Sequence, residues 1–94
     1  MISPTGKAAT RMVIFATTRQ GFESLRALID TGAHPVWVGA SVLTAGEIQT
    51  WRARGLDLTV FDHDIDPRHP GQLAAALDTV AEHYPGEVVW VDAR

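Results

Sequence analysis

The 94-residue chain contains no cysteine, which excludes a disulfide, a thiol nucleophile and a zinc site built on thiolates. Charge of neither sign dominates, because 8 Lys and Arg stand against 11 Asp and Glu, a formal net charge of −3. This balance lacks the clustered basic residues of nonspecific nucleic-acid binding, and we expect no nucleic-acid partner. Long apolar runs are also missing, since none approaches the roughly 18–20 residues of a membrane span. Residues 1–10 lack the apolar segment of a secretory signal, so we expect a cytoplasmic protein with no membrane partner.

The composition is that of an ordinary globular protein. Apolar residues make up 46% of the chain and charged residues 20%, a balance that argues against global disorder. The length fits one hydrophobic core. Residues 1–10 are small, polar and punctuated by proline and glycine, and we expect them to form a flexible tail. The prediction is a single small domain over residues 11–94.

Four short apolar runs, rich in β-branched and aromatic residues, are spaced regularly along the chain. The first, second and fourth are apolar at successive positions, which is typical of strands buried on both faces of a parallel sheet. We therefore predict strands over Arg11–Thr17, Pro35–Ala40, Leu56–Asp62 and Glu87–Asp92.

The three segments between these runs have helical spacing of apolar residues. The first predicted helix covers Gln20–Thr31. The second begins after a capping box, with Thr44 as N-cap and Glu47 at the third helical position, and it ends at Gly55. The third covers about Pro70–Tyr84, with proline in the first turn, where its missing N–H costs nothing.

The predicted element order is therefore β-α-β-α-β-α-β. Crossovers this short are right-handed and connect parallel strands. We expect a three-layer Rossmann-like or flavodoxin-like α/β domain with a four-stranded parallel sheet. Strand order 2-1-3-4 is preferred, with 3-2-1-4 as the alternative. Three crossover helices must divide two and one between the faces, so one face is expected to have too little cover.

The tripeptide Val-Trp-Val occurs in both the second and the fourth predicted strand. We expect Trp37 and Trp90 to lie on one face of the sheet and the flanking valines on the other. Apolar surface left in water costs roughly 25 cal/mol per Å². The sequence thus favours a homodimer, with the two tryptophans at its interface. The alternative is that the N-terminal tail folds back over this face.

Ligands of open parallel sheets bind beside the carboxyl ends of the strands. Hydroxyl, guanidinium and glycine groups gather there, before the N-terminus of the first predicted helix. We predict a small anionic, phosphorylated ligand at Thr18, Arg19, Gly21, Ser41 and Arg94. The alternative is that a threonine only caps the helix and the arginine is solvated.

A second polar loop, residues 62–69, is dense in carboxylates and imidazoles, which are ligands of Mg²⁺, Mn²⁺ and Zn²⁺. Asp62, Asp64 and His69 are the candidate metal ligands. The alternative is that Asp62 ends the strand, Asp66 caps the turn and the other side chains are solvated. The calcium-loop pattern fails, because the glycine and the bidentate glutamate it needs are absent.

No nucleophile motif surrounds any serine, so we predict no catalytic residues and no cofactor. The preferred function is a non-catalytic module that acts by self-association or by binding a partner protein. The alternative is an anion-binding domain. A metal-assisted phosphoryl-transfer or hydrolytic enzyme comes third.

Overall fold

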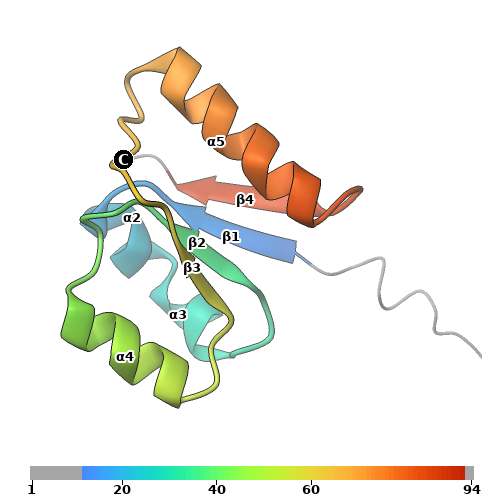
Figure 1. Ribbon diagram of the computed structural model, residues 1–94. Helices are drawn as coiled ribbons and strands as arrows, with labels where there is room; N and C mark the ends of the chain where they lie inside the picture. Colours follow the sequence, from blue (N-terminus) through green and yellow to red (C-terminus); the bar gives the residue numbers. More distant parts are fainter. Residues whose placement is uncertain (1–11, 93–94) are drawn as a thin grey trace, which may run out of the picture.

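The computed structural model describes residues 12–92, which form a four-stranded parallel sheet with helices on both faces (Figure 1). The predicted tail over residues 1–10 and Arg94 lie outside the described residues. None of the helices within residues 12–92 is long and apolar enough to cross a membrane. The elements are β1 (Met12–Ala16), α2 (Arg19–Ser24), α3 (Arg26–Asp30), β2 (Val36–Val38), α4 (Ala45–Ala53), β3 (Leu58–Val60), α5 (Pro70–His83) and β4 (Val88–Asp92).

The predicted α/β class and all-parallel sheet are confirmed, and each strand lies inside its predicted run. The first predicted helix, however, is interrupted at Leu25, where φ is −96° and ψ is 8°. Just before the break, the Ser24 hydroxyl donates to the carbonyl of Gln20 at 3.0 Å. Such a bond to the preceding turn competes with regular helix geometry and often bends the helix. Two short helices, α2 and α3, therefore replace the single helix.

The strand order is β3-β2-β1-β4, so the preferred order 2-1-3-4 is wrong and the order found is 3-2-1-4. The chain steps outward from β1 to β2 to β3, and only then crosses back to pair β4 with β1. Because every crossover is right-handed, connections that run in opposite directions place their helices on opposite faces. Figure 1 shows α5 on one side of the sheet and the other three helices on the other side.

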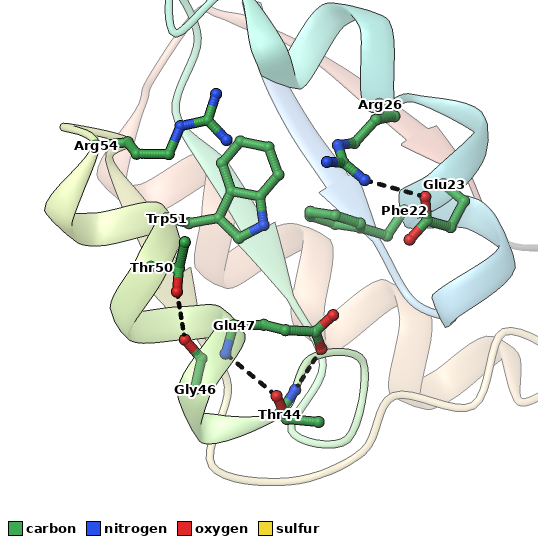
Figure 2. A pocket seen from close by; sticks show the side chains of 9 residues that line it. All are labelled: Phe22, Glu23, Arg26, Thr44, Gly46, Glu47, Thr50, Trp51 and Arg54. Atoms are coloured by element: carbon green, nitrogen blue, oxygen red, sulfur yellow. Dashed lines mark hydrogen bonds and ion pairs between the residues drawn. The ribbon is translucent and has the colours of Figure 1, made fainter.

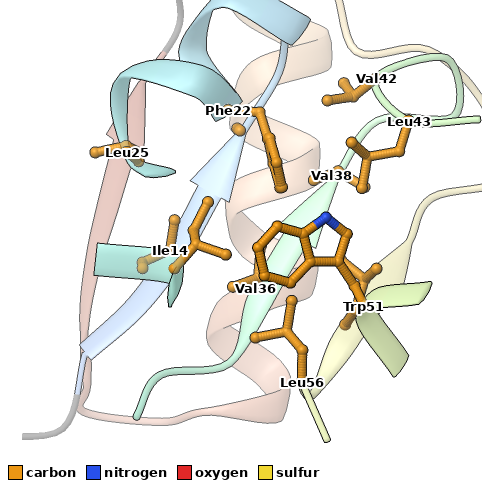
Figure 3. Close-up of a cluster of buried hydrophobic side chains, with 12 residues drawn as sticks. Ile14, Phe22, Leu25, Val36, Val38, Val42, Leu43, Trp51 and Leu56 are labelled. Atoms are coloured by element: carbon orange, nitrogen blue, oxygen red, sulfur yellow. The ribbon is translucent and has the colours of Figure 1, made fainter. Parts of the chain in front are cut away.

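The sheet separates two hydrophobic clusters. The cluster under α2, α3 and α4 is drawn in Figure 3, with the Trp51 indole among strand valines and Phe22. The second lies under α5, where one helix suffices to bury the centre of its face. Its buried members are Val13, Phe15, Trp37, Ile65, Ala76 and Val80.

The two Val-Trp-Val segments do not place their indoles on one face, so that expectation is wrong. Trp37 lies beside Phe15 in the sheet, whereas Trp90 lies beside Ile14. Consecutive strand residues point to opposite faces, and a register difference of one residue therefore separates the indoles. Trp37 is 5% exposed beneath α5, and Trp90 is 50% exposed on the other face.

The capping box of α4 is confirmed. The Glu47 N–H donates to the Thr44 hydroxyl at 3.2 Å, and the Thr44 N–H donates to Glu47 Oε1 at 2.9 Å. Ile48 is the first residue after this box whose N–H enters the helical ladder, donating to the Thr44 carbonyl at 3.0 Å. The capping-box pattern therefore identifies the first residue of α4 correctly.

Proline substitution tests this boundary. Ala45 is the first helical residue and follows an extended Thr44, with φ −76° and ψ 163°, so Ala45→Pro should be tolerated. Ile48→Pro removes a ladder hydrogen bond and should cost about 3 kcal/mol or more. Urea unfolding of both variants checks the difference; equal losses would contradict the boundary.

Candidate functional site

A shallow hollow of about 240 Å³ lies beside the carboxyl ends of the strands. Three of the five predicted anion-binding residues, Thr18, Arg19 and Ser41, line it together. Thr17, Val42 and Asp64 complete its wall. The hollow lies at the end of the sheet where parallel sheets bind ligands, but it is lined by the loops after β1, β2 and β3 and not by the switch point between β1 and β4. The bonding of these residues decides whether the hollow suits an anion.

The Arg19 guanidinium is already bound to carboxylates. Its Nη1 and Nη2 atoms each lie 2.7 Å from an oxygen of Glu47, and its Nε lies 3.2 Å from Glu23 Oε2. The hydrogen bonds from Arg19, followed by that from the Thr44 N–H, lower the pKa of Glu47 to about 2. The pair is partly exposed, so its main effect is geometric. Arg19 fastens α2 to the N-terminus of α4.

A carboxylate also lies on the other side of the hollow. Asp64 Oδ1 accepts hydrogen bonds from the Ser41 N–H at 3.0 Å and from the Ser41 hydroxyl. The serine groups that were predicted to hold an anion therefore hold a side chain of the same chain. A negative charge there disfavours a second anion.

Thr18 and Gly21 build the start of α2. The Gly21 N–H donates to the Thr18 hydroxyl at 3.0 Å, which is an N-cap contact. A Cβ on Gly21 would lie only 2.8 Å from the carbonyl oxygen of Asp92. Glycine is therefore needed at this position because α2 approaches the end of β4 closely. The alternative interpretation of Thr18, that a threonine caps the helix, is confirmed.

The three candidate metal ligands are not brought together. Asp62 Oδ1 lies 2.7 Å from Nδ1 of His63, and this hydrogen bond lowers the pKa of Asp62. Asp64 binds the Ser41 loop, while His69 Nδ1 accepts the N–H of Gln72 at 3.2 Å as the N-cap of α5. Within residues 12–92 no group of three His, Asp or Glu side chains is arranged to hold a metal ion.

A larger groove of about 500 Å³, which the sequence reasoning missed, lies between α4 and the α2–α3 pair (Figure 2). The guanidinium carbons of Arg26 and Arg54 lie 5.0 and 4.7 Å from the Trp51 ring centroid. Phe22 meets the same indole edge-on, at 5.9 Å between centroids. The three-residue spacing between Trp51 in α4 and Arg54 at its C-cap is the sequence signal for this contact. The stack closes the rim of the core.

The surface of β4 is the remaining feature. Val88 and Trp90, 63% and 50% exposed, are the large hydrophobic residues exposed within the described chain. Both lie on the α2–α3 side, because they pair with Met12 and Ile14, whose side chains pack into the cluster on that face. Of the two tryptophans predicted at an interface, only Trp90 reaches the surface.

The two edge strands of the sheet differ in protection. On β3, the Arg52 side chain donates from Nε and Nη2 to the Leu58 carbonyl, at 3.2 and 2.9 Å. Within residues 12–92, β4 pairs only with β1, and its five residues include no lysine, arginine or proline. Such residues are the usual protection of an edge strand. β4 is therefore an open, apolar edge of the described domain.

Comparison of the chain with protein-family models, with curated proteins and with solved structures found no significant match.

The contact between α2 and β4 is tested at Gly21. Gly21→Ala forces a Cβ against the Asp92 carbonyl and should destabilise the fold by about 1–3 kcal/mol in urea unfolding. Gly46→Ala, whose Cβ meets nothing closer than 4.0 Å in the first turn of α4, is the matched control. It should be neutral or stabilising by up to about 1 kcal/mol. Equal stability of the two variants would refute the close approach.

The Arg19–Glu47 pair is tested by pH. The folded-state pKa of about 2 lies below the ordinary value of 4.5, so the pair stabilises the folded chain above pH 4.5. That contribution is lost as the pH falls through 4.5 toward 2. Arg19→Gln should raise the pKa of Glu47, which carboxyl NMR measures. The Tm of this variant should lie below that of the wild type at neutral pH, and the difference should shrink on acidification.

Arg68→Gln is the control for this titration, because the Arg68 side chain is 92% exposed and its ion-pair partner is Asp66, at 3.8 Å, and not Glu47. It should leave the pKa of Glu47 unchanged. An unchanged pKa in Arg19→Gln as well would mean that the capping box alone holds the carboxylate ionised.

Proposed function

We propose that this chain is a non-catalytic α/β module that acts by self-association through β4. The single observation that supports the proposal is the open, apolar edge of β4, with Val88 and Trp90 in water. An unprotected edge presents unpaired backbone N–H and C=O groups and is a template for another strand. On the second edge of the same sheet, Arg52 occupies the Leu58 carbonyl of the three-residue strand β3.

The physical driving force is burial of apolar surface together with backbone pairing. A buried tryptophan removes on the order of 150–250 Å² from water, and aromatic residues are enriched in interface cores. Trp90 is half exposed and is not one of the side chains that pack into either hydrophobic cluster. Exposure of this apolar surface is unfavourable in the isolated chain, and a second chain that covers Trp90 removes it from water.

The polar groups at the carboxyl edge support a non-catalytic role. Arg19 is held by Glu47 and Glu23, and Ser41 is held by Asp64. A ligand or substrate would have to compete with these internal bonds. The hollow, at about 240 Å³, is also smaller than the roughly 300–1,000 Å³ of pockets for small molecules.

We infer that the architecture is Rossmann-like rather than flavodoxin-like. The order β3-β2-β1-β4 equals that of the first four strands of the Rossmann arrangement, whereas a flavodoxin-like sheet begins 2-1-3. This inference concerns topology alone, and a dinucleotide role does not follow from it. The loop after β1, residues 17–21, lacks the glycine-rich turn of dinucleotide-binding domains.

Sedimentation equilibrium across a concentration series tests the proposal. The mass of the wild-type chain should rise above that of a 10.2 kDa monomer at micromolar concentration. Trp90→Glu places a charge on the proposed interface and should return the mass to that of the monomer. Ala75→Glu, which adds the same charge on the exposed side of α5, should leave association unchanged.

Two outcomes would count against this function. A wild-type chain that stays monomeric at every concentration would remove it. A dimer that is equally insensitive to both glutamates would move the association to another surface.

A further inference from the structure

We infer that the second copy pairs antiparallel with β4 about a two-fold axis through Trp90, so that the two sheets join into one of eight strands. The inference rests on the proposed self-association and adds its geometry. Two observations carry it: the direction in which the β4 backbone groups point, and the alternation of its side chains.

The backbone groups of β4 divide into an inner and an outer set. The Thr17 N–H donates to the Asp92 carbonyl at 3.3 Å, so the polar groups of Asp92 face β1. The N–H and C=O of one strand residue point the same way, and the direction alternates along the strand. The backbone N–H and C=O of Trp90 therefore face β1 as well. Val89 and Val91 present two N–H and two C=O groups to the open edge.

Symmetry then limits the register. A closed dimer uses the same surface twice, which for two strands at a sheet edge requires an antiparallel pair. A two-fold axis perpendicular to the sheet keeps every side chain on its own face, so paired residues are both odd or both even in number. A centre on Trp90 pairs all five residues of β4. Val88 lies opposite Asp92 of the second copy, and Val89 lies opposite Val91.

This register also gives hydrogen-bond partners to the backbone groups at the open edge of β4. Val89 and Val91 are the outward-facing residues, and opposite one another they exchange both hydrogen bonds. All four outward groups of each chain find partners in this way. Trp90 falls at a non-hydrogen-bonded position, where the paired Cα atoms approach to about 4.5 Å and side-chain contact is closest. The two exposed indoles then cover one another.

The charges are compatible with the arrangement. Asp92 is the only ionisable residue in β4, and the pairing places it opposite Val88. The two Asp92 residues then lie at opposite ends of the paired strands, roughly 14 Å apart at about 3.4 Å per residue. A shift of the centre by one residue places Trp90 opposite Val88 or Asp92 and leaves part of the strand unpaired. A pairing only five residues long lies at the small end of specific interfaces, so we expect micromolar affinity.

The absence of cysteine makes cross-linking a direct test, because any disulfide must form at an introduced residue. Trp90→Cys brings two sulfurs to a position within the usual Cα separation of a disulfide, roughly 4.4–6.8 Å. Under mild oxidation its mass should double on a non-reducing gel. Val88→Cys is the matched control, since this residue is at least as exposed as Trp90 but lies about 14 Å from its copy.

A second pair of variants keeps the indole that drives association. Val89→Cys and Val91→Cys chains should each remain monomeric on the gel when oxidised alone. An equimolar mixture should give the disulfide dimer, because the two positions face one another across the axis. This measurement is decisive if Trp90→Cys weakens association.

The outcomes separate the register from the function. Association that Trp90→Glu abolishes, without a cross-link in Trp90→Cys or in the mixture, overturns the register and leaves self-association standing. A disulfide in Val88→Cys alone likewise overturns the register, in favour of another pairing. A wild-type chain that remains monomeric overturns both. Cross-links in Trp90→Cys and in the mixture, with none in the three controls, support the inference.

Discussion

The right-handedness of the crossovers is the constraint on which the rest of this structure depends. Two connections run outward from β1 and bring α2, α3 and α4 to one face. The third runs back across the sheet and brings α5 to the other face. With only these helices, the central strands β1 and β2 are covered on both sides. β4, added last at the edge, has Val89 and Val91 half covered by α5, and Val88 and Trp90 exposed on its other side.

Charged residues hold this layout together through contacts within the chain. Arg19 joins α2 to α4 through Glu47, Arg52 binds the Leu58 carbonyl of β3, and Asp64 ties the loop after β2 to the loop after β3. Arg19 and Asp64 are side chains that the sequence analysis assigned to a ligand. The carboxyl edge of the sheet is rich in polar groups because its loops need these bonds to hold their shape.

The same geometry explains why the exposed apolar surface lies on the face with more helices. A count of helices predicts that the face with one helix is the bare one. In the structure α5 lies over the centre of its face, where it buries Trp37 and Phe15. On the opposite face α4 packs against β3, whereas α2 packs against β1 and reaches β4 at Asp92. Bare surface is therefore decided by where helices lie along the sheet, and Val88 and Trp90 are the part of β4 that they leave open.

The sequence by itself determined the α/β class, the position of every strand and the first residue of α4, because these follow from apolar periodicity and from contacts within a few residues. It did not determine the strand order, since both candidate orders satisfy the same local pattern. Nor did it show that Trp37 and Trp90 lie on opposite faces, because strands 50 residues apart can shift by one position without any local sign. Glu47, which binds the Arg19 guanidinium, is 28 residues away in the chain. Only tertiary structure decides such pairs, since they depend on how whole elements pack and not on the residues beside them in the chain.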